Sequence, residues 1–203
     1  PALAENVIFV APHAQEAAGD NAIPQTLAGV CAAVLGEQVE SEIVQSDRVY
    51  HTGADPMERM ATRAQFVGPG TAGANYVLVD DVMNMGGTLA ELSNYIQMGG
   101  AQVAAVLVLA HAGRDKSLQA QPKFVRILQE RYGHEFFDTF GIRPSALSAN
   151  EAQYLVGFRT LDEIRNRLAT AQQEIHRRLR AKGIAHAFAS AQLDAHVASA
   201  LNP

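Results

Sequence analysis

The sequence predicts an α/β fold in which a parallel, twisted sheet is flanked by helices and a helical extension follows. Short apolar runs typical of buried strands alternate with segments of helical periodicity. This alternation favours a parallel sheet with right-handed crossovers. From Ser148 onward only helical patterns remain. We therefore expect an α/β core over residues 1–147 and a helical C-terminal extension over residues 148–203.

The elements in the first part of the chain are predicted from short local signals. An apolar run forms the first strand, and the helix that follows has a proline in its first turn and Gly36 just past its end. A weaker β pattern comes next, and a long polar segment then contains one helical stretch. The expected elements are strands at 7–10 and 42–45 and helices at 24–35 and 56–66.

The later elements have clearer boundaries. Gly99 and Gly100 end one helix, and the pairs Ser148/Glu151 and Thr160/Glu163 have the spacing of capping boxes. The strand after Gly100 has the most β-like composition of the chain. The expected elements are strands at 76–82, 103–109 and 135–140, a helix that reaches Met98, and helices at 122–132, from Ser148, and at 160–182.

Residues 76–89 carry the main functional signal. Four apolar residues lead to Asp80 and Asp81 near the strand end, and a short loop with two glycines and a threonine then runs into a helix. Glycines allow close backbone approach, helix N-termini bind anions, and carboxylates accept hydrogen bonds from hydroxyl groups. Such a unit can hold a sugar phosphate, and an ordinary strand-to-helix connection is the alternative.

This segment resembles the phosphoribosyl-pyrophosphate (PRPP) binding motif of the type I phosphoribosyltransferases, which is an apolar run, an acidic pair and a small-residue loop. The resemblance implies that Asp80 and Asp81 are catalytic, bind the ribose hydroxyls and hold magnesium, largely through water or substrate. Family members often carry Thr-Thr where this chain has Asn and Met. The residues implied to bind the 5′-phosphate are Asn84, Met85, Gly86, Gly87 and Thr88.

The region before the motif is similar to the ComF-like branch of this family. A proline-containing turn follows the first strand, and spaced arginines precede the motif. Where the branch has an R-G-F-N-like element, Ala18 replaces its arginine. The resemblance implies pyrophosphate contacts from Pro12, His13, Ala14, Arg48, Arg59 and Arg63, and a base contact from His111.

The loops that carry these residues are expected to converge, because ligands bind beyond the carboxyl ends of parallel strands. The loops lie at 11–16, 80–88 and 110–115. Several of their side chains also have plain interpretations. Arg59 and Arg63 share a helical face and fit a solvated surface or pairing with Glu58 equally well. His13 and His111 are as compatible with structural roles as with ligand contacts.

The resemblance implies transfer of a phosphoribosyl group to or from a nitrogenous base, with pyrophosphate as co-product and magnesium as cofactor. The expected ligands are PRPP and a nucleobase-like molecule. A non-catalytic PRPP- or nucleotide-binding regulatory protein is the alternative. It is motivated by the losses at Ala18 and at Asn84 and Met85, and by the few basic residues before position 100, namely Arg48, Arg59 and Arg63.

Composition bounds the remaining possibilities. The chain has 203 residues, of which 48% are hydrophobic, and no apolar run approaches the roughly 18 residues of a membrane helix. The sequence begins without a basic stretch, so we expect a cytoplasmic protein.

With a net charge of −5, the basic end of the helix at 160–182 fits the helix macrodipole better than nucleic-acid binding. The apolar stripe of that helix needs a partner surface, which leaves a homodimer open.

Overall fold

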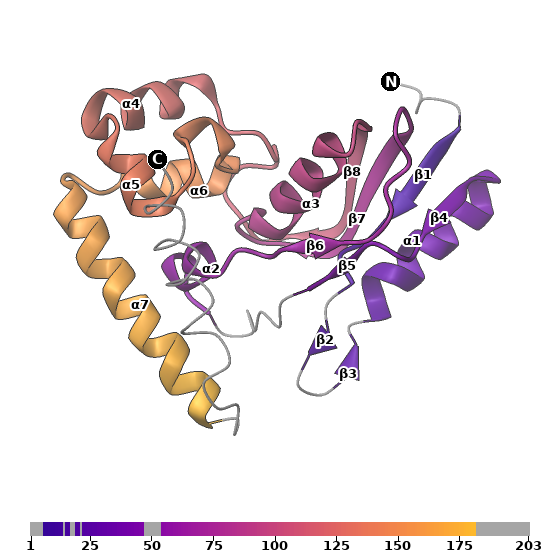
Figure 1. The fold of residues 1–203 in the computed structure, drawn as a ribbon, viewed down its shortest axis with the longest axis horizontal. Helices are drawn as coiled ribbons and strands as arrows, with labels where there is room; N and C mark the ends of the chain where they lie inside the picture. Colours follow the sequence, from indigo (N-terminus) through magenta and orange to yellow (C-terminus); the bar gives the residue numbers. More distant parts are fainter. Residues whose placement is uncertain (1–5, 14, 17–18, 21, 47–53, 182–203) are drawn as a thin grey trace, which may run out of the picture.

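The structure is a computed structural model that describes residues 6–13, 15–16, 19–20, 22–46 and 54–181. Its centre is a four-stranded parallel sheet in the order β4-β1-β7-β8 (Figure 1). In chain order the elements are β1 (Val7–Val10), β2 (Gln15–Glu16), β3 (Gly19–Asp20), α1 (Ala22–Leu35), β4 (Gln38–Glu40), β5 (Val44–Gln45), α2 (Pro56–Ala61), β6 (Phe66–Val67), β7 (Asn75–Met83), α3 (Gly87–Met98), β8 (Gln102–His111), α4 (Pro122–Tyr132), α5 (Glu135–Phe140), η1 (Pro144–Ala146), α6 (Ala149–Val156) and α7 (Leu161–Ala181).

The central strand β7 is buried on both faces of the sheet. Successive side chains of a strand point to opposite faces. Val77 and Val79 accordingly pack with α1, whereas Tyr76 and Leu78 pack with α3 on the other face. This two-sided burial explains why the sequence of β7 is a continuous apolar run. The predicted parallel sheet with helices on both faces is confirmed.

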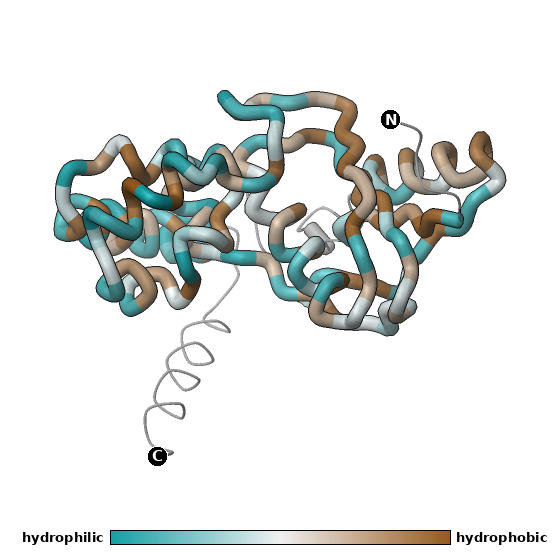
Figure 2. The backbone as a smooth tube through the Cα atoms, turned by 90° about the horizontal axis from the view of Figure 1, so that it is seen from above, coloured by the Kyte–Doolittle hydropathy of each residue, from teal (hydrophilic) through white to brown (hydrophobic). Residues whose placement is uncertain are grey.

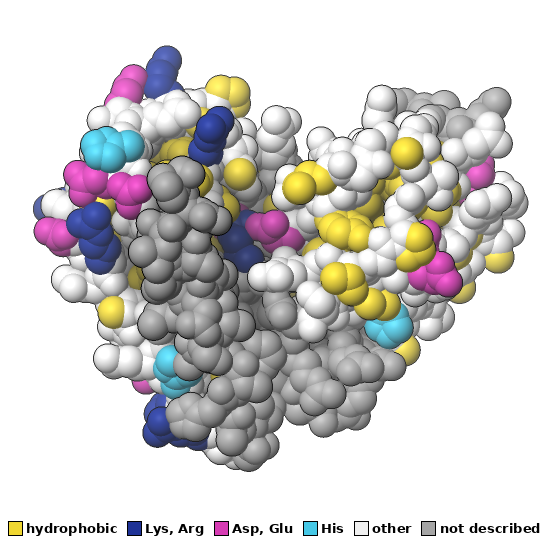
Figure 3. All heavy atoms as spheres, in the orientation of Figure 1, with side chains coloured by type: hydrophobic (Ala, Val, Ile, Leu, Met, Phe, Trp, Pro, Cys, Tyr) yellow, Lys and Arg dark blue, Asp and Glu magenta, His cyan; other side chains and the backbone are white. Residues whose placement is uncertain are grey.

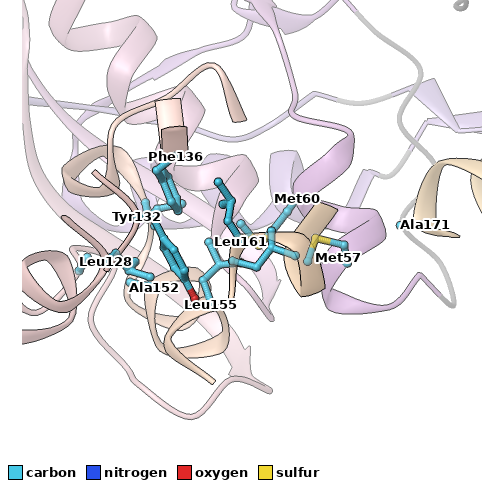
Figure 4. Packing of buried hydrophobic residues seen from close by; sticks show 12 residues of the cluster. Met57, Met60, Leu128, Tyr132, Phe136, Ala152, Leu155, Leu161 and Ala171 are labelled. Atoms are coloured by element: carbon cyan, nitrogen blue, oxygen red, sulfur yellow. The ribbon is translucent and has the colours of Figure 1, made fainter. Parts of the chain in front are cut away.

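The helices α2, α4, α5, α6 and α7 form a second core beside the sheet. Figure 2 shows this helical part next to the sheet part, not stacked over one of its faces. Figure 4 shows Met57 and Met60 of α2 among side chains of the other helices. The core includes Tyr132 and Leu155, which lie on opposite sides of position 147. The division of the chain at that position remains a prediction.

Several predicted elements are confirmed with the expected signals. Helix α1 ends at Leu35, directly before Gly36, which has a φ of +72°. Helix α4 has the predicted bounds. Ser148 and Glu151 form a reciprocal capping box at the start of α6. The apolar stripe of α7 packs within the molecule, since Ile164 and Ala171 are buried in the helical core.

The predicted strand at 135–140 is wrong, because this segment is helix α5. The aromatic residues there are spaced by four, which places them on one face of a helix. Phe136 is fully buried, and its ring centroid lies 6.4 Å from that of Tyr132 and 4.8 Å from that of Phe140. Packing between these rings therefore favours the helix over an extended strand.

Two further predictions need correction. Within 42–45 only Val44 and Gln45 are extended, and they pair antiparallel with β6 outside the main sheet. The second strand of the main sheet is β4, which pairs with β1 directly after α1. The helix expected at 56–66 ends at Ala61, because Phe66 is buried in an extended segment that packs against α3.

An apolar groove of about 610 Å³ lies between α1 and β8. Val30, Val34 and Leu107 are among its lining residues, and every residue of β8 is at least partly exposed. Within the described ranges, no helix combines the length and apolar character needed to cross a bilayer. The homodimer suggested by the sequence stays a prediction.

The helical core yields a stability prediction. Phe136→Ala should lower the free energy of unfolding by about 3–5 kcal/mol, because the substitution leaves a cavity among Tyr132, Phe140 and their neighbours. Phe137→Ala is the matched control, since Phe137 is exposed, and it should change this free energy by about 0.5 kcal/mol or less. Urea unfolding followed by circular dichroism measures both values. Equal effects of the two substitutions would contradict the helical packing of this segment.

Candidate functional site

A pocket lies where the loop after β7 meets the end of α2 and the start of α6. Its volume is about 50 Å³, and it opens beyond the carboxyl end of β7, where parallel sheets bind ligands. Figure 3 shows a hollow between the helical part and the sheet part, with basic and acidic side chains at its base. The lining residues are Arg59, Thr62, Arg63, Ala64, Asp80, Val82, Met83, Asn84, Met85, Gly86, Gly87, Thr88, Leu89 and Glu151.

The loop from Asn84 to Thr88 forms one wall of the pocket. Gly86 has a φ of +81°, a conformation that glycine adopts without strain, and α3 begins at the next residue. No side chain caps this helix, and its first turn holds no acidic residue. The N-terminal amide groups of α3 therefore provide a potential anion-binding site.

The two aspartates of the motif point to different faces of the sheet. Asp80 has the same strand parity as Tyr76 and Leu78 and lines the pocket. Asp81 is not among the lining residues, and its Oδ1 accepts a hydrogen bond of 2.7 Å from the backbone N–H of Val82. The alternation of side chains along β7 therefore separates the two carboxylates.

Asp80 has an unusual protonation equilibrium. Burial raises the pKa of its carboxyl group from 3.8 to about 7, and the neighbouring charge of Asp81 adds to this increase. The hydrogen bond that Asp80 Oδ1 accepts from the backbone N–H of Asp81, at 2.9 Å, acts in the opposite direction. Near neutral pH a proton or a cation can therefore stabilise this carboxyl group.

Arg63 is held between two carboxylates. It donates to Glu91 and, over 2.8 Å, to Oε2 of Glu151. Burial alone would lower the pKa of the Arg63 guanidinium, but these two carboxylates outweigh burial and raise it. Arg59 also lines the pocket and donates to the carbonyl of Ala54 over 3.1 Å. Arg59 and Arg63, two of the three arginines predicted to contact pyrophosphate, thus lie at the pocket.

The other predicted contacts lie elsewhere or outside the described residues. Ala14 and Arg48 fall outside the described ranges. Pro12 and His13 do not line the pocket, and their carbonyl groups accept hydrogen bonds from Gln25 and Gln45. His111 pairs with Met83 in the sheet, and its Nε2 lies 2.7 Å from the carbonyl oxygen of Asp115. Of the three loops expected to converge, those at 80–88 and 110–115 lie together, since the backbone N–H of Ala112 donates to the carbonyl of Met83 over 2.9 Å. Only the loop at 80–88 lines the pocket, together with the segment after α2.

Residues at the start of α6 hold the loop at 84–88 and the loop after β8, and sequence reasoning missed this role. Ser148 donates through Oγ to the carbonyl of Met85. Asn150 Oδ1 accepts from the backbone N–H groups of Arg114, at 2.7 Å, and Asp115, at 2.9 Å. The capping box signalled the start of a helix, but nothing in its pattern indicated contact with a loop more than sixty residues away.

Glu151 lies against the first residue of α3. Its side chain is 1% exposed, and its Oε2 accepts from the backbone N–H of Ser148 over 2.8 Å. A Cβ atom added to Gly87 would lie only 2.8 Å from Oε1 of Glu151. A side chain at this position would therefore have to displace the Glu151 carboxylate.

Two further sequence features have structural explanations. A G-x-G-x-x-G spacing occurs at 68–73, but it connects β6 to β7 and so lacks the strand-to-helix context of a dinucleotide site. At the basic end of α7, Arg178 pairs with the buried Glu58 at 2.6 Å and Arg177 pairs with Glu174 at 2.7 Å. These pairs agree with the structural interpretation of that basic end.

The donor set is compatible with one mode of magnesium binding. Among the described residues, no group of three or more His, Cys, Asp or Glu side chains could hold a metal ion. Magnesium is commonly held by one or two carboxylates together with substrate phosphates. Asp80 and Glu151 are the carboxylates that line the pocket, so magnesium would need oxygen ligands from a bound substrate.

Asp80 gives a pH-dependent prediction. Its pKa is about 7 in the folded protein against 3.8 ordinarily, so the folded state binds this proton more tightly than the unfolded chain. The contribution of Asp80 to stability is therefore full below its ordinary pKa and is lost as pH rises towards 7. Asp80→Asn should raise the free energy of unfolding relative to the parent more at pH 8 than at pH 4.

Urea unfolding at the two pH values measures this difference. Asp138→Asn is the control, because Asp138 is exposed and should show no comparable pH-dependent gain. A carboxyl titration by NMR gives the pKa of Asp80 directly, and a value near 4 would contradict the prediction.

Comparison with known proteins gives two sequence relatives, and no protein-family model matches the chain. Protein TraN of Escherichia coli is 39% identical over 166 residues, which cover 79% of this chain and 37% of TraN. An uncharacterized protein of Haemophilus influenzae is 37% identical over 92 residues, which cover 45% of this chain and 21% of that protein. The chain thus spans little more than a third of the length of TraN and about a fifth of the length of the second relative. The ComF-like branch remains a prediction.

Solved structures with a related arrangement include two phosphoribosyltransferases. Adenine phosphoribosyltransferase from Thermoanaerobacter pseudethanolicus has a TM-score of 0.38 and 16% identity, over 53% of this chain and 58% of that chain. Trypanosoma cruzi hypoxanthine phosphoribosyl transferase has a TM-score of 0.33 and 13% identity, over 74% of this chain and 76% of that chain. Likeness of this degree does not identify an activity.

Proposed function

We propose that this protein binds PRPP at the pocket beside Asp80 and transfers its phosphoribosyl group to or from a nitrogenous base, with pyrophosphate as co-product. One observation carries the proposal: the uncapped N-terminus of α3, the carboxylate of Asp80 and the guanidinium of Arg63 line a single pocket. Together they offer an anion site, a hydroxyl acceptor and a cation, which are the groups a phosphorylated pentose needs.

The backbone would bind the 5′-phosphate. The backbone N–H groups of residues 86–88 lie at the N-terminus of α3 and would donate hydrogen bonds to the phosphate. The helix dipole also favours an anion at this end. Asp80 would accept hydrogen bonds from the ribose hydroxyl groups. Arg59 and Arg63 would lie towards the pyrophosphate, and catalysis would consist mainly of positioning and electrostatic stabilisation. Magnesium, held by Asp80 and substrate oxygens, would neutralise negative charge on the leaving group.

A non-catalytic PRPP- or nucleotide-binding protein is the second candidate. It is favoured by the ion pairs of Arg63, because both Glu91 and Glu151 already neutralise this guanidinium. A side chain that is paired in this way contributes less to binding a leaving group. On this alternative, the protein binds the phosphorylated ligand without turning it over.

Isothermal titration calorimetry with PRPP and MgCl₂ tests the binding part of the proposal. Asp80→Asn should weaken binding by about 10- to 100-fold, because a hydrogen bond to a charged acceptor contributes about 1.5–3 kcal/mol. Asp81→Asn makes the same charge change one residue along the strand. We expect it to weaken binding less, since Asp81 does not line the pocket. Absence of PRPP binding by the folded parent protein would overturn the proposal.

Turnover separates the two candidates. The parent protein is incubated with PRPP, MgCl₂ and a panel of purine and pyrimidine bases, and pyrophosphate release is followed. Release with one base supports the transferase. PRPP binding without release for any base supports the regulatory protein instead.

A further inference from the structure

We infer that Glu151 determines the phosphate affinity of this site, because its carboxylate occupies the phosphate loop when no ligand is bound. Glu151 lies outside the sequence motif, at the start of α6. The inference rests on the proposed function, and it adds a residue that limits which ligands can enter.

The position of the carboxylate is well defined. Oε2 is held by the backbone N–H of Ser148 at 2.8 Å and by Nη2 of Arg63 at 2.8 Å. Oε1 faces Gly87, so closely that a Cβ atom there would lie 2.8 Å away. Within the described part of the chain Oε1 receives no hydrogen bond. The side chain thus presents an unpartnered charged oxygen to the start of α3.

A phosphate at the same helix N-terminus would compete with this carboxylate. Carboxylates and phosphates are both stabilised by the positive end of a helix dipole. A phosphate at the start of α3 and the Glu151 carboxylate would repel each other, and the repulsion would be strong because the side chain of Glu151 is only 1% exposed. The 5′-phosphate can therefore bind only if Glu151 moves away from Gly87 or loses its charge.

Arg63 strengthens the competition. Its guanidinium compensates the buried charge of Glu151 and so keeps the carboxylate in place. The same guanidinium is a candidate partner for the incoming ligand. A bound phosphate must therefore either break the Arg63–Glu151 ion pair or bind without a contact to Arg63. Either outcome lowers the affinity for phosphate.

Glu151→Gln tests this inference because glutamine keeps the shape of the side chain and can still accept the hydrogen bond from Ser148. Calorimetry with ribose 5-phosphate and with ribose, each in MgCl₂, should show ribose 5-phosphate binding at least about tenfold tighter to the variant than to the parent, as expected for removal of one nearby like charge. Affinity for ribose should change little. Thermal unfolding shows whether both proteins are folded.

Glu91→Gln is the matched control. Glu91 also pairs with Arg63, but it lies further along α3 and does not line the pocket. We expect its substitution to change ribose 5-phosphate affinity by less than about threefold. An equal gain for both variants would mean that release of Arg63 alone is responsible, and it would overturn the inference.

The remaining outcomes are distinct. If the parent binds ribose 5-phosphate and Glu151→Gln binds it no more tightly, the inference fails and the proposed function stands. If neither folded protein binds ribose 5-phosphate or PRPP, the proposed function fails as well.

A crystal of the parent soaked with ribose 5-phosphate gives a test without any variant. The Glu151 carboxylate should leave Gly87, and a bound phosphate beside an unmoved carboxylate would contradict the inference.

Discussion

The ion pairs of Arg63 with Glu151 and Glu91 connect the helical part of the molecule to the sheet part at the pocket. Arg63 lies just after α2, and Glu151 belongs to the first turn of α6. Both side chains are largely removed from solvent, so each charge needs the other to offset the cost of burial. Glu91 brings α3 into the same network. One guanidinium and two carboxylates thus link the end of α2 with α3 and α6 beside the pocket.

This network also gives the pocket its chemical character. The start of α3 and Arg63 attract anions, whereas Asp80 and Glu151 attract cations and hydrogen-bond donors. A ligand that suits both halves carries phosphate and hydroxyl groups together. The raised pKa of Asp80 and the unpartnered oxygen of Glu151 are the signs of a site whose groups are not yet satisfied within the protein.

Local patterns predicted the strand-loop-helix unit of β7 and α3, the end of α1 at Gly36 and the bounds of α4. These patterns gave the wrong result where the same residues are compatible with both a helix and a strand. The aromatic residues around Phe136 are compatible with a strand by propensity, and their ring packing with Tyr132 decides for a helix. Strand β4 was missed because glutamine and glutamate flank its single valine, and only pairing with β1 makes it a strand.

The sequence by itself determined the α/β class, the glycine-containing loop between β7 and α3 and the presence of Arg59 and Arg63 before it, because periodicity, glycine and charge act over a few residues. Tertiary structure alone decided that Asp80 and not Asp81 lines the pocket, since the direction of a strand side chain depends on which face the sheet buries. It also decided that Glu151 meets Gly87. Contacts between distant helices follow from how complete cores pack, and no local pattern encodes that packing.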